Sequence, residues 1–162
     1  MVTLICAVAE NGAIGFQNRL LFPLRADLQR FKKLTTGHTV VMGRNTFESL
    51  PKGALPNRRN IVVSSSVSEP WPNTEVFPTL QAALAACTED SETFIIGGAR
   101  MYAEGMAMAN RLCLTHVHAT PAEADVFFPE VNYEEWECDF KEYHPADEIH
   151  PQAFTFADYH KK

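Results

Sequence analysis

Four short hydrophobic runs occur along the chain, and hardly any polar residue interrupts them. They occupy residues 4–8, 40–42, 61–63 and 94–96. Runs without polar alternation are typical of strands that are buried on both faces, as in a parallel sheet covered by helices. We therefore expect these four segments to be inner strands of one sheet.

Hydrophobic residues at helical spacing lie between these runs. One such stripe consists of Leu24, Leu28, Phe31 and Leu34. Thr79 is a suitable N-cap for a second helix, and a third follows residues 97–98. Strands that alternate with helices predict an α/β fold, a three-layer sandwich with a mainly parallel central sheet and helices on both of its faces.

The C-terminal third follows a different pattern, in which hydrophobic and charged residues alternate. The hydrophobic positions are Trp136, Cys138 and Phe140, and Phe154 and Phe156 continue the pattern after a polar loop. Period-two alternation indicates one solvent-exposed face, so we expect antiparallel strands at one edge of the sheet. No repeat or long linker divides the chain, which predicts a single domain over residues 1–162.

Composition and charge exclude several classes of protein. The 162 residues include 14 basic and 20 acidic side chains, which gives a formal net charge of −6. Such a chain lacks the broad positive field that nonspecific nucleic-acid binding needs, so no nucleic-acid partner is expected. No hydrophobic run approaches the ~20 residues of a membrane span, and residues 2–9 lack the basic flank of an export signal. We expect a cytoplasmic protein without a membrane partner.

The cysteines and histidines do not form a recognisable site. The four cysteines are widely spaced and include no C-x-x-C pair. We interpret each cysteine as a small buried residue in a reducing compartment, without a disulfide framework or a zinc site. The six histidines show no metal-ligand spacing either, so no metal is expected.

Two glycine-containing junctions join a predicted strand to a predicted helix. Gly97-Gly98 follows one buried run, and Gly43-Arg44 follows another. Glycine lets the backbone approach a ligand closely, and arginine binds phosphate. The other cations near these junctions are Arg58, Arg59 and Arg100. Tight turns and solvated cations would explain each feature, and the G-x-G-x-x-G and phosphate-loop fingerprints are absent. Two such junctions in one sheet nevertheless favour a dinucleotide across the strand ends.

Asp27 lies one turn into the first predicted helix, between hydrophobic residues of its stripe. An acidic residue in a first turn is usually exposed and favoured by the helix dipole. The alternative is a carboxylate at the edge of a hydrophobic pocket, where burial suits it to binding or proton transfer. Spacing leaves both interpretations open and supports an α/β enzyme that binds an anionic nucleotide.

Taken together, these segments resemble the dihydrofolate reductase family over nearly the whole chain. The resemblance rests on Ala7, Tyr102 and residues 13–15, 26–28, 31–32, 41–49, 55–58, 95–98 and 114–116. Each piece is short, but their order and spacing are specific. The resemblance implies reduction of 7,8-dihydrofolate to 5,6,7,8-tetrahydrofolate, by hydride transfer from NADPH with protonation of the pterin N5. This reaction belongs to one-carbon metabolism and thymidylate synthesis.

The resemblance also implies a substrate site. Asp27 aligns with the family's pocket carboxylate, which accepts a planar pair of pterin N–H groups, and Thr115 steadies this end of the pocket. Together with Phe22, Asp27 and Thr115 form the expected catalytic set. Arg58 aligns with the arginine that binds the glutamate α-carboxylate of folate. The other expected substrate contacts are Ile5, Ala7, Leu28, Phe31, Lys32, Leu50, Lys52, Leu55, Ile96 and Tyr102.

A cofactor site follows from the same resemblance. Arg44, Ser65 and Arg100 match positions around the adenosine 2′-phosphate, so NADPH is expected rather than NADH. Residues 11–24 correspond to a mobile lid, and Asp125 matches a residue that contacts this lid near Gly15. The full expected set is Ala7, Ile14, Gly15, Asn18, Leu20, Gly43, Arg44, Asn45, Thr46, Val63, Ser64, Ser65, Gly97, Gly98, Ala99, Arg100, Met101 and Tyr102. The resemblance further implies a monomer that binds dihydrofolate and antifolate inhibitors.

The lid departs from the family pattern at one pair of residues. Many members have Pro-Trp where this chain has Leu21-Phe22. The indole N–H of that Trp donates to a water beside the pocket carboxylate, and Phe22 has no such donor. We therefore expect diaminopyrimidine antifolates to bind this chain more weakly than usual.

Two other functions stay open on the sequence. The NADPH-dependent reductase of riboflavin biosynthesis shares the sheet but acts on a ribosylated pyrimidine, and Asp27 with Arg58 suits a pterin with a glutamate tail better. The other alternative is a sensor that binds the nucleotide without turnover, and the intact pair of Asp27 and Thr115 argues against it.

Overall fold

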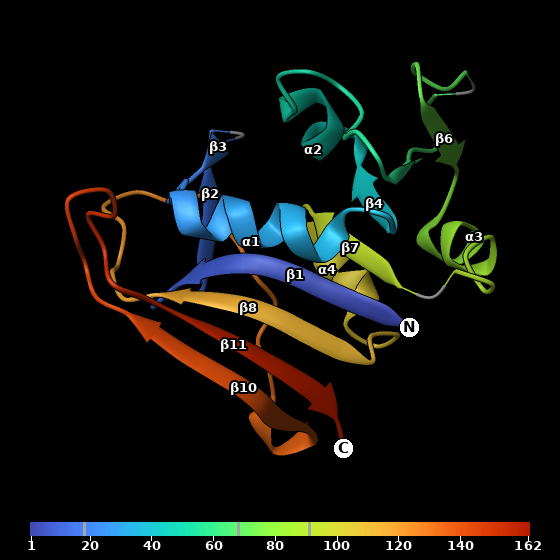
Figure 1. Ribbon diagram of the computed structural model, residues 1–162. Coiled ribbons are helices and arrows are strands. Elements are labelled where there is room, and N and C mark those ends of the chain that lie inside the picture. The colour runs from blue at the N-terminus through green and yellow to red at the C-terminus, as the bar shows by residue number, and fades with distance from the viewer. Residues whose placement is uncertain (18, 68, 91) are drawn as a thin grey trace.

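The structure is a computed structural model that describes residues 1–17, 19–67, 69–90 and 92–162. Its elements are β1 (Val2–Ala9), β2 (Ala13–Phe16), β3 (Arg19–Leu20), α1 (Arg25–Thr35), β4 (Thr39–Gly43), α2 (Arg44–Ser49), β5 (Arg59–Val63), β6 (Thr74–Phe77), α3 (Leu80–Ala85), β7 (Thr93–Gly97), α4 (Ala99–Gly105), β8 (Arg111–Val117), β9 (Val126–Phe127), the 3-10 helix η1 (Tyr133–Glu135), β10 (Trp136–His144) and β11 (Phe154–Lys161). Within the described ranges, one eight-stranded sheet has the order β10-β11-β8-β1-β7-β4-β5-β6, and a small sheet has the order β3-β2-β9. Figure 1 shows α1 in front of the large sheet and α4 behind it.

The directions of the strands agree with the predicted fold class. The strands from β8 to β6 run parallel to their neighbours. β11 is antiparallel to both β8 and β10, so the antiparallel strands lie at one edge of the sheet. The prediction of a mainly parallel sheet with antiparallel C-terminal edge strands is confirmed.

Helices cover both faces of the sheet, and each face has its own hydrophobic cluster. Ile95 on β7 packs in a cluster with Met101 of α4 and residues of α3. Its neighbour Phe94 packs in a second cluster, with Phe47 of α2 and Leu34 of α1. Neighbouring residues on a strand point to opposite faces. The uninterrupted hydrophobic runs are therefore strands buried on both faces, as predicted.

Local signals in the sequence place two of the helices correctly. The hydroxyl of Thr79 caps α3 by accepting a hydrogen bond from the backbone N–H of Ala82 at 3.1 Å. The helix predicted after Gly98 is α4. The stripe on α1 is less uniform than its spacing indicates, because Leu24 is buried whereas Leu28 is 46% exposed.

The C-terminal strands differ from the prediction in one respect. β11 is buried on both faces along residues 154–159, since Phe154 and Phe156 pack in one hydrophobic cluster and Ala157 and Tyr159 pack in another. In β10 the pairing register shifts at a β-bulge: Cys138 pairs with Tyr159, and Phe140 pairs with Asp158. Since those two partners are neighbours on β11, the bulge turns Cys138 and Phe140 to opposite faces. The expected alternation therefore breaks inside the strand.

All four cysteines are free thiols. Cys87 and Cys113 are buried and Cys6 is partly buried, but Cys138 is exposed on the edge strand. The expectation that every cysteine is buried is wrong for Cys138. Among the described residues, no helix combines the length and the hydrophobicity needed to cross a bilayer. The same residues include no group of three His, Cys, Asp or Glu side chains placed to hold a metal ion.

Candidate active site

The strands β7, β4 and β5 are parallel neighbours, so their carboxyl ends lie side by side at the same end of the sheet. The two glycine junctions come together there: a Cβ placed on Gly43 would lie 3.6 Å from Cγ of Met101 and 3.9 Å from the backbone nitrogen of Gly98. A Cβ placed on Gly97 would lie 3.0 Å from Oγ1 of Thr46. The Gly97-Gly98 peptide is cis. Bare backbone and one hydroxyl thus face the same small space, which suits a pyrophosphate.

Arg44, the first residue of α2, lies beside the hydroxyl run that follows β5. Its Nη1 donates to Oγ of Ser66 at 3.3 Å, and its Nε donates to Glu48 at 2.5 Å. The hydroxyl of Ser64 lies 3.3 Å from that of Ser66. Arg100 differs from Arg44, because its side chain is 85% exposed. Arg44 therefore lies beside the serine hydroxyls, as expected. Its hydrogen bond goes to Ser66, which is not among the residues that the resemblance implies.

The remaining residues of the expected cofactor set differ in how far they are buried. Val63, Ser64 and Ala99 are partly buried, and Asn45 and Ser65 are exposed. Asn18 lies outside the described residues.

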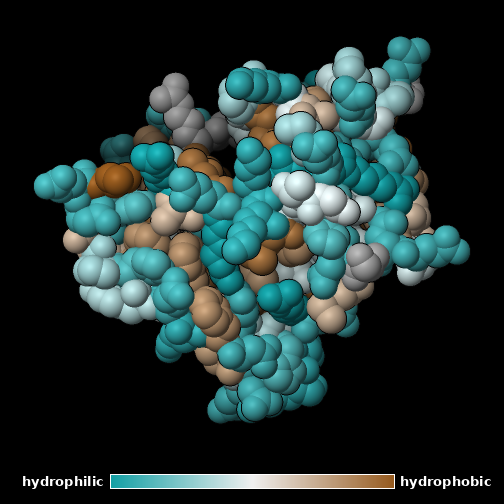
Figure 2. All heavy atoms as spheres, in the orientation of Figure 1, coloured by the Kyte–Doolittle hydropathy of each residue, from teal (hydrophilic) through white to brown (hydrophobic). Residues whose placement is uncertain are grey.

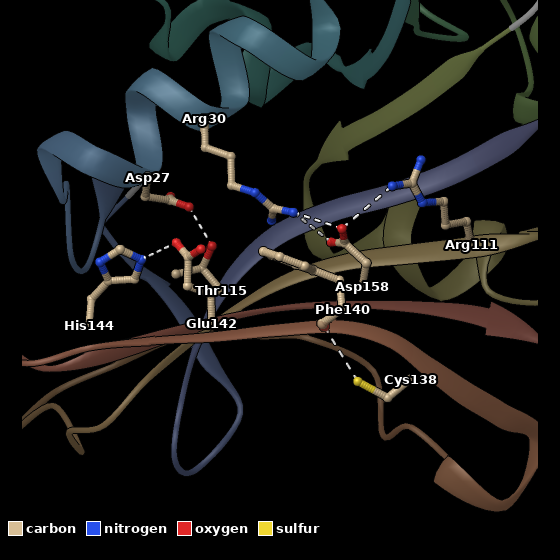
Figure 3. A network of polar contacts seen from close by, with 9 residues as sticks. All are labelled: Asp27, Arg30, Arg111, Thr115, Cys138, Phe140, Glu142, His144 and Asp158. Atoms are coloured by element: carbon tan, nitrogen blue, oxygen red, sulfur yellow. Dashed lines mark hydrogen bonds and ion pairs between the residues drawn. The ribbon is translucent and has the colours of Figure 1, made fainter.

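Asp27 lies in the first turn of α1, and its carboxylate points toward β8 (Figure 3). The hydroxyl of Thr115 on β8 donates a hydrogen bond to its Oδ1. Burial raises the pKa of Asp27 above its ordinary value, while the bond from Thr115 and the charge of Arg30 oppose the rise. Asp27 is thus a partly buried carboxylate, and its interpretation as an exposed first-turn residue is wrong.

Arg30, one turn further along α1, ties the helix to β11 (Figure 3). Its Nη2 lies 2.8 Å from both carboxylate oxygens of Asp158, which Arg111 approaches at 3.5 Å. The side chains of Arg30 and Asp158 are 17% and 10% exposed, and the guanidinium lies 4.7 Å from the centre of the Phe156 ring. The sequence interpretation missed this anchor. No local signal marks it, because Asp158 lies in a strand whose sequence also contains Thr155, His160 and Lys161.

Most of the hydrophobic residues expected around the substrate lie in two clusters. Ile5, Leu50, Leu55 and Ile96 pack around the cluster that contains Phe47. Ala7 and Phe22 pack around a cluster that contains Leu24. Leu28 is exposed on α1, and Phe31 is partly buried. On the face that carries α1, brown hydrophobic atoms are visible between teal polar ones (Figure 2).

Tyr102 reaches this region from the other side of the sheet. Its ring belongs to the cluster of Met101 on α4. Its hydroxyl donates to the backbone carbonyl of Ile5 at 2.7 Å. Tyr102 therefore links α4 to β1 beside the glycine junctions.

Arg58 lies near the end of α1 opposite to Asp27. Its Nη1 donates to the hydroxyl of Thr35, the last residue of α1, at 3.1 Å, and its Nε donates to the carbonyl of Pro56 at 2.9 Å. The step from residue 27 to residue 35 is about 12 Å along a helix axis. Burial lowers the pKa of Arg58, but a guanidinium stays cationic at neutral pH.

The other candidate cations differ in what they contact. Arg59 begins β5, and its guanidinium pairs with Glu75 at 2.6 Å and with Asp90 at 3.0 Å. These ion pairs place it among protein carboxylates at the amino end of the strand, away from the glycine junctions. Lys32 and Lys52 are exposed.

The small sheet β3-β2-β9 contains part of the segment that resembles a lid. The backbone N–H of Asp125 donates to the carbonyl of Gly15 at 3.1 Å, and its Oδ2 accepts from the backbone N–H of Gln17 at 3.1 Å. The expected contact of Asp125 near Gly15 is therefore present. Ile14 is buried, whereas Leu20 is 63% exposed.

An open groove of about 750 Å³ lies on the opposite face of the sheet. It is lined by His116, His118, Tyr133, Lys141, Tyr143, Thr155 and Tyr159. His116 follows Thr115 on β8, so the groove and the carboxylate of Asp27 lie on different faces. The imidazole nitrogens bond to neighbours, His116 to Tyr159 at 3.0 Å and His118 to Thr155 at 2.7 Å. None of the described residues of the expected site lines this groove.

The chain is similar to known proteins along its whole length. A model of the dihydrofolate reductase family matches residues 1–161. The type 3 dihydrofolate reductase of Salmonella typhimurium is 42% identical over 156 residues, which cover 96% of this chain and 95% of the relative. The dihydrofolate reductase of Bacillus subtilis is 39% identical over 162 residues, which cover 100% of this chain and 95% of the relative.

A solved structure gives the same result for the fold. It is a dihydrofolate reductase from Enterococcus faecalis complexed with NADP(H) and RAB-propyl. The TM-score is 0.92 at 32% identity, with 100% of this chain and 96% of the other covered. Structural similarity, sequence identity and the family match agree, and the chain belongs to the dihydrofolate reductase family.

Proposed function

We propose that this chain reduces dihydrofolate between α1 and the strands β1 and β8, beside the carboxyl ends of β4, β5 and β7. As a dihydrofolate reductase it is an NADPH-dependent oxidoreductase, which forms tetrahydrofolate by adding a hydride and a proton to the pterin. The observation that supports this site is the partly buried carboxylate of Asp27, which accepts a hydrogen bond from Thr115.

Asp27 binds the pterin in this proposal. A carboxylate offers two acceptor oxygens, and the N3–H and 2-amino groups of the pterin form a coplanar pair of donors. The bond from Thr115 fixes the rotation of the carboxylate. Because burial raises the pKa of Asp27, a proton is held near the substrate at higher pH than an exposed aspartate allows. Asp27 binds the edge of the ring remote from N5, so a water molecule carries the proton to N5.

Arg58 binds the glutamate α-carboxylate at the other end of α1. A substrate extended along the helix would place its ring at Asp27 and its tail about 12 Å away, near Thr35 and Arg58. The hydrogen bonds to Thr35 and Pro56 orient the guanidinium before the substrate arrives. Lys32 and Lys52 add positive charge at the rim.

The residues at the strand ends fit NADPH, which supplies the hydride. Gly43, Gly97 and Gly98 leave room for a pyrophosphate next to the hydroxyl of Thr46. Arg44 beside Ser66 offers a cation and a hydroxyl to the 2′-phosphate, the group that distinguishes NADPH from NADH.

A coupled assay separates this function from the two alternatives. Loss of NADPH absorbance that depends on dihydrofolate supports the proposed reaction. Turnover with a ribosylated pyrimidine, and none with dihydrofolate, would identify a reductase of the riboflavin type. NADPH binding without any turnover would identify a sensor.

We also propose that residues 1–162 act as one domain and as a cytoplasmic monomer that binds no nucleic acid. Helices on both faces pack against the same sheet, which supports one domain. A net charge of −6 disfavours binding to a polyanion. Light scattering on the purified chain is expected to give the mass of one chain, 18.1 kDa, and twice this mass would contradict the proposal.

Phe22→Trp is expected to strengthen the binding of diaminopyrimidine antifolates by about fivefold, the effect of one net hydrogen bond of ~1 kcal/mol. Phe22 packs in the same cluster as Ala26, the neighbour of Asp27, so an indole N–H there can donate to a water beside the carboxylate. Inhibition constants of both proteins measure the effect. Tyr143→Trp on the exposed edge strand is the control. Ordinary potency that Phe22→Trp leaves unchanged would refute the hypothesis.

A further inference from the structure

The first turn of α1 has no side-chain cap of its own. Its N-cap is Leu24, whose side chain cannot accept a hydrogen bond, and the first bond inside the helix runs from the N–H of Leu28 to the carbonyl of Leu24 at 3.0 Å. The N–H groups of residues 25–27 therefore need acceptors from outside the helix. Asp27 belongs to this turn, so whatever holds the turn also sets the position of its carboxylate.

His150 supplies such an acceptor from a distant part of the sequence. The backbone N–H of Ala26 donates to Nε2 of His150 at 3.0 Å, across 124 residues. His150 lies in the connection between β10 and β11, is 9% exposed, and packs its ring 5.2 Å from that of Phe154. Because a backbone N–H can only donate, Nε2 carries no proton.

Asp147 fixes this tautomer of His150. Nδ1 of His150 lies 3.1 Å from Oδ1 and 3.3 Å from Oδ2 of Asp147, so Nδ1 holds the ring proton and donates it. Oδ1 of Asp147 also accepts from the backbone N–H groups of Ile149 at 2.9 Å and His150 at 2.6 Å. These bonds, foremost the one from the His150 backbone, lower the pKa of Asp147 and keep it ionised. Asp147, His150 and Ala26 thus form one ordered chain of hydrogen bonds.

We infer that His150 is a positioning residue for dihydrofolate reduction, which caps the first turn of α1 and so aligns Asp27 with Thr115. The inference rests on the role proposed for Asp27. An unprotonated nitrogen suits the positive end of the helix dipole, which a cationic imidazole would oppose. Asp158 on β11 holds the next turn through Arg30, so the C-terminal hairpin anchors the helix on both sides of Asp27.

The tautomer of His150 tests the geometry without reference to activity. ¹⁵N spectra of the intact protein are expected to show an unprotonated Nε2 and a protonated Nδ1 for this residue. His150→Gln identifies its signals by their loss. A proton on Nε2 at neutral pH would overturn the inference, because the bond from Ala26 could then not form.

Substitutions test the effect of His150 on the reaction. His150→Leu is expected to lower kcat roughly tenfold, less than the ~10²-fold that a misplacement of 1 Å can cost. The Kd of NADPH should not change, because the proposed cofactor residues lie at the ends of other strands. His150→Gln places an amide oxygen near the position of Nε2 and should restore most of the rate. His160→Leu, in the same hairpin beside Glu137 and Asp139, is the matched control and should retain the wild-type rate.

A double-mutant cycle distinguishes positioning from a general loss of structure. In an Asp27→Asn background, His150→Leu should lower kcat little further, because no carboxylate is left to align. A full tenfold loss in that background, or a Gln variant as slow as the Leu variant, would overturn the inference. If Asp27→Asn alone has no effect, the proposed function of Asp27 fails; if only His150→Leu has none, positioning fails. If His150→Leu does not fold, the rate of His150→Gln and the ¹⁵N spectra of His150 still test the inference.

Discussion

Asp27→Asn is expected to lower kcat for dihydrofolate by about 10²- to 10⁴-fold at neutral pH, the usual effect of losing an acid–base group. The amide cannot carry the negative charge that favours protonation at N5. At low pH the loss should shrink, because the substrate then arrives already protonated. Steady-state rates with NADPH across this pH range measure both effects. A variant with the wild-type pH–rate profile would remove Asp27 from the mechanism.

The stability of Asp27→Asn serves as its control. Because burial raises the pKa of Asp27, the folded protein disfavours the ionised form, and this cost is present above the raised pKa and disappears below the ordinary one. A neutral amide removes the cost. The Tm of the variant at neutral pH is therefore expected to equal or exceed that of the wild type. A low rate with an intact Tm assigns the loss to chemistry.

Arg58→Leu is expected to raise the KM for dihydrofolate by roughly 10- to 100-fold, since a charge-assisted hydrogen bond contributes about 1.5–3 kcal/mol. The guanidinium is held by Thr35 and Pro56 in an orientation that a leucine cannot reproduce. The Kd of NADPH should change little, because Arg58 lies near the end of α1 and not at the glycine junctions. Initial rates over a range of dihydrofolate concentrations, with NADPH binding measured by fluorescence, give both constants.

Lys33→Leu is the matched control for Arg58→Leu. Lys33 is exposed in the last turn of α1 and is not among the residues proposed to bind the substrate. Its removal tests whether the loss of any positive charge in this region raises the KM. An unchanged KM in Arg58→Leu would mean that the glutamate tail binds elsewhere, and equal effects in both variants would indicate nonspecific attraction.

The sheet and its helices could be predicted from the sequence because their signals are local. An uninterrupted run such as residues 94–96 identifies a strand buried on both faces, and both faces of β7 are indeed covered. The hydroxyl of Thr79 identifies the start of α3 in the same way. The resemblance then supplied the pairing of Asp27 with Thr115, which no local pattern contains.

Other features depend on contacts between distant residues, and the sequence shows no sign of them. The bulge in β10 is a feature of its pairing with β11. The alternating pattern predicts Cys138 and Phe140 on the same face, and the bulge turns them to opposite faces. Arg30 and Asp158 are ordinary charged residues in the sequence and become an anchor only when α1 lies against β11. The partner of His150 is a backbone N–H, which every residue except proline carries, so no sequence pattern identifies this contact.

The anchoring of α1 by residues 150 and 158 also has a consequence for biosynthesis. Residues 25–35 leave the ribosome long before residues 150 and 158, which anchor them, have been made. β10 lies next to β11 and not next to β8, so these two strands join the large sheet when β11 pairs with β8. A nascent chain can therefore form β1, β4 and β5 early in translation, whereas α1 is held on both sides of Asp27 only after residue 158 has been made.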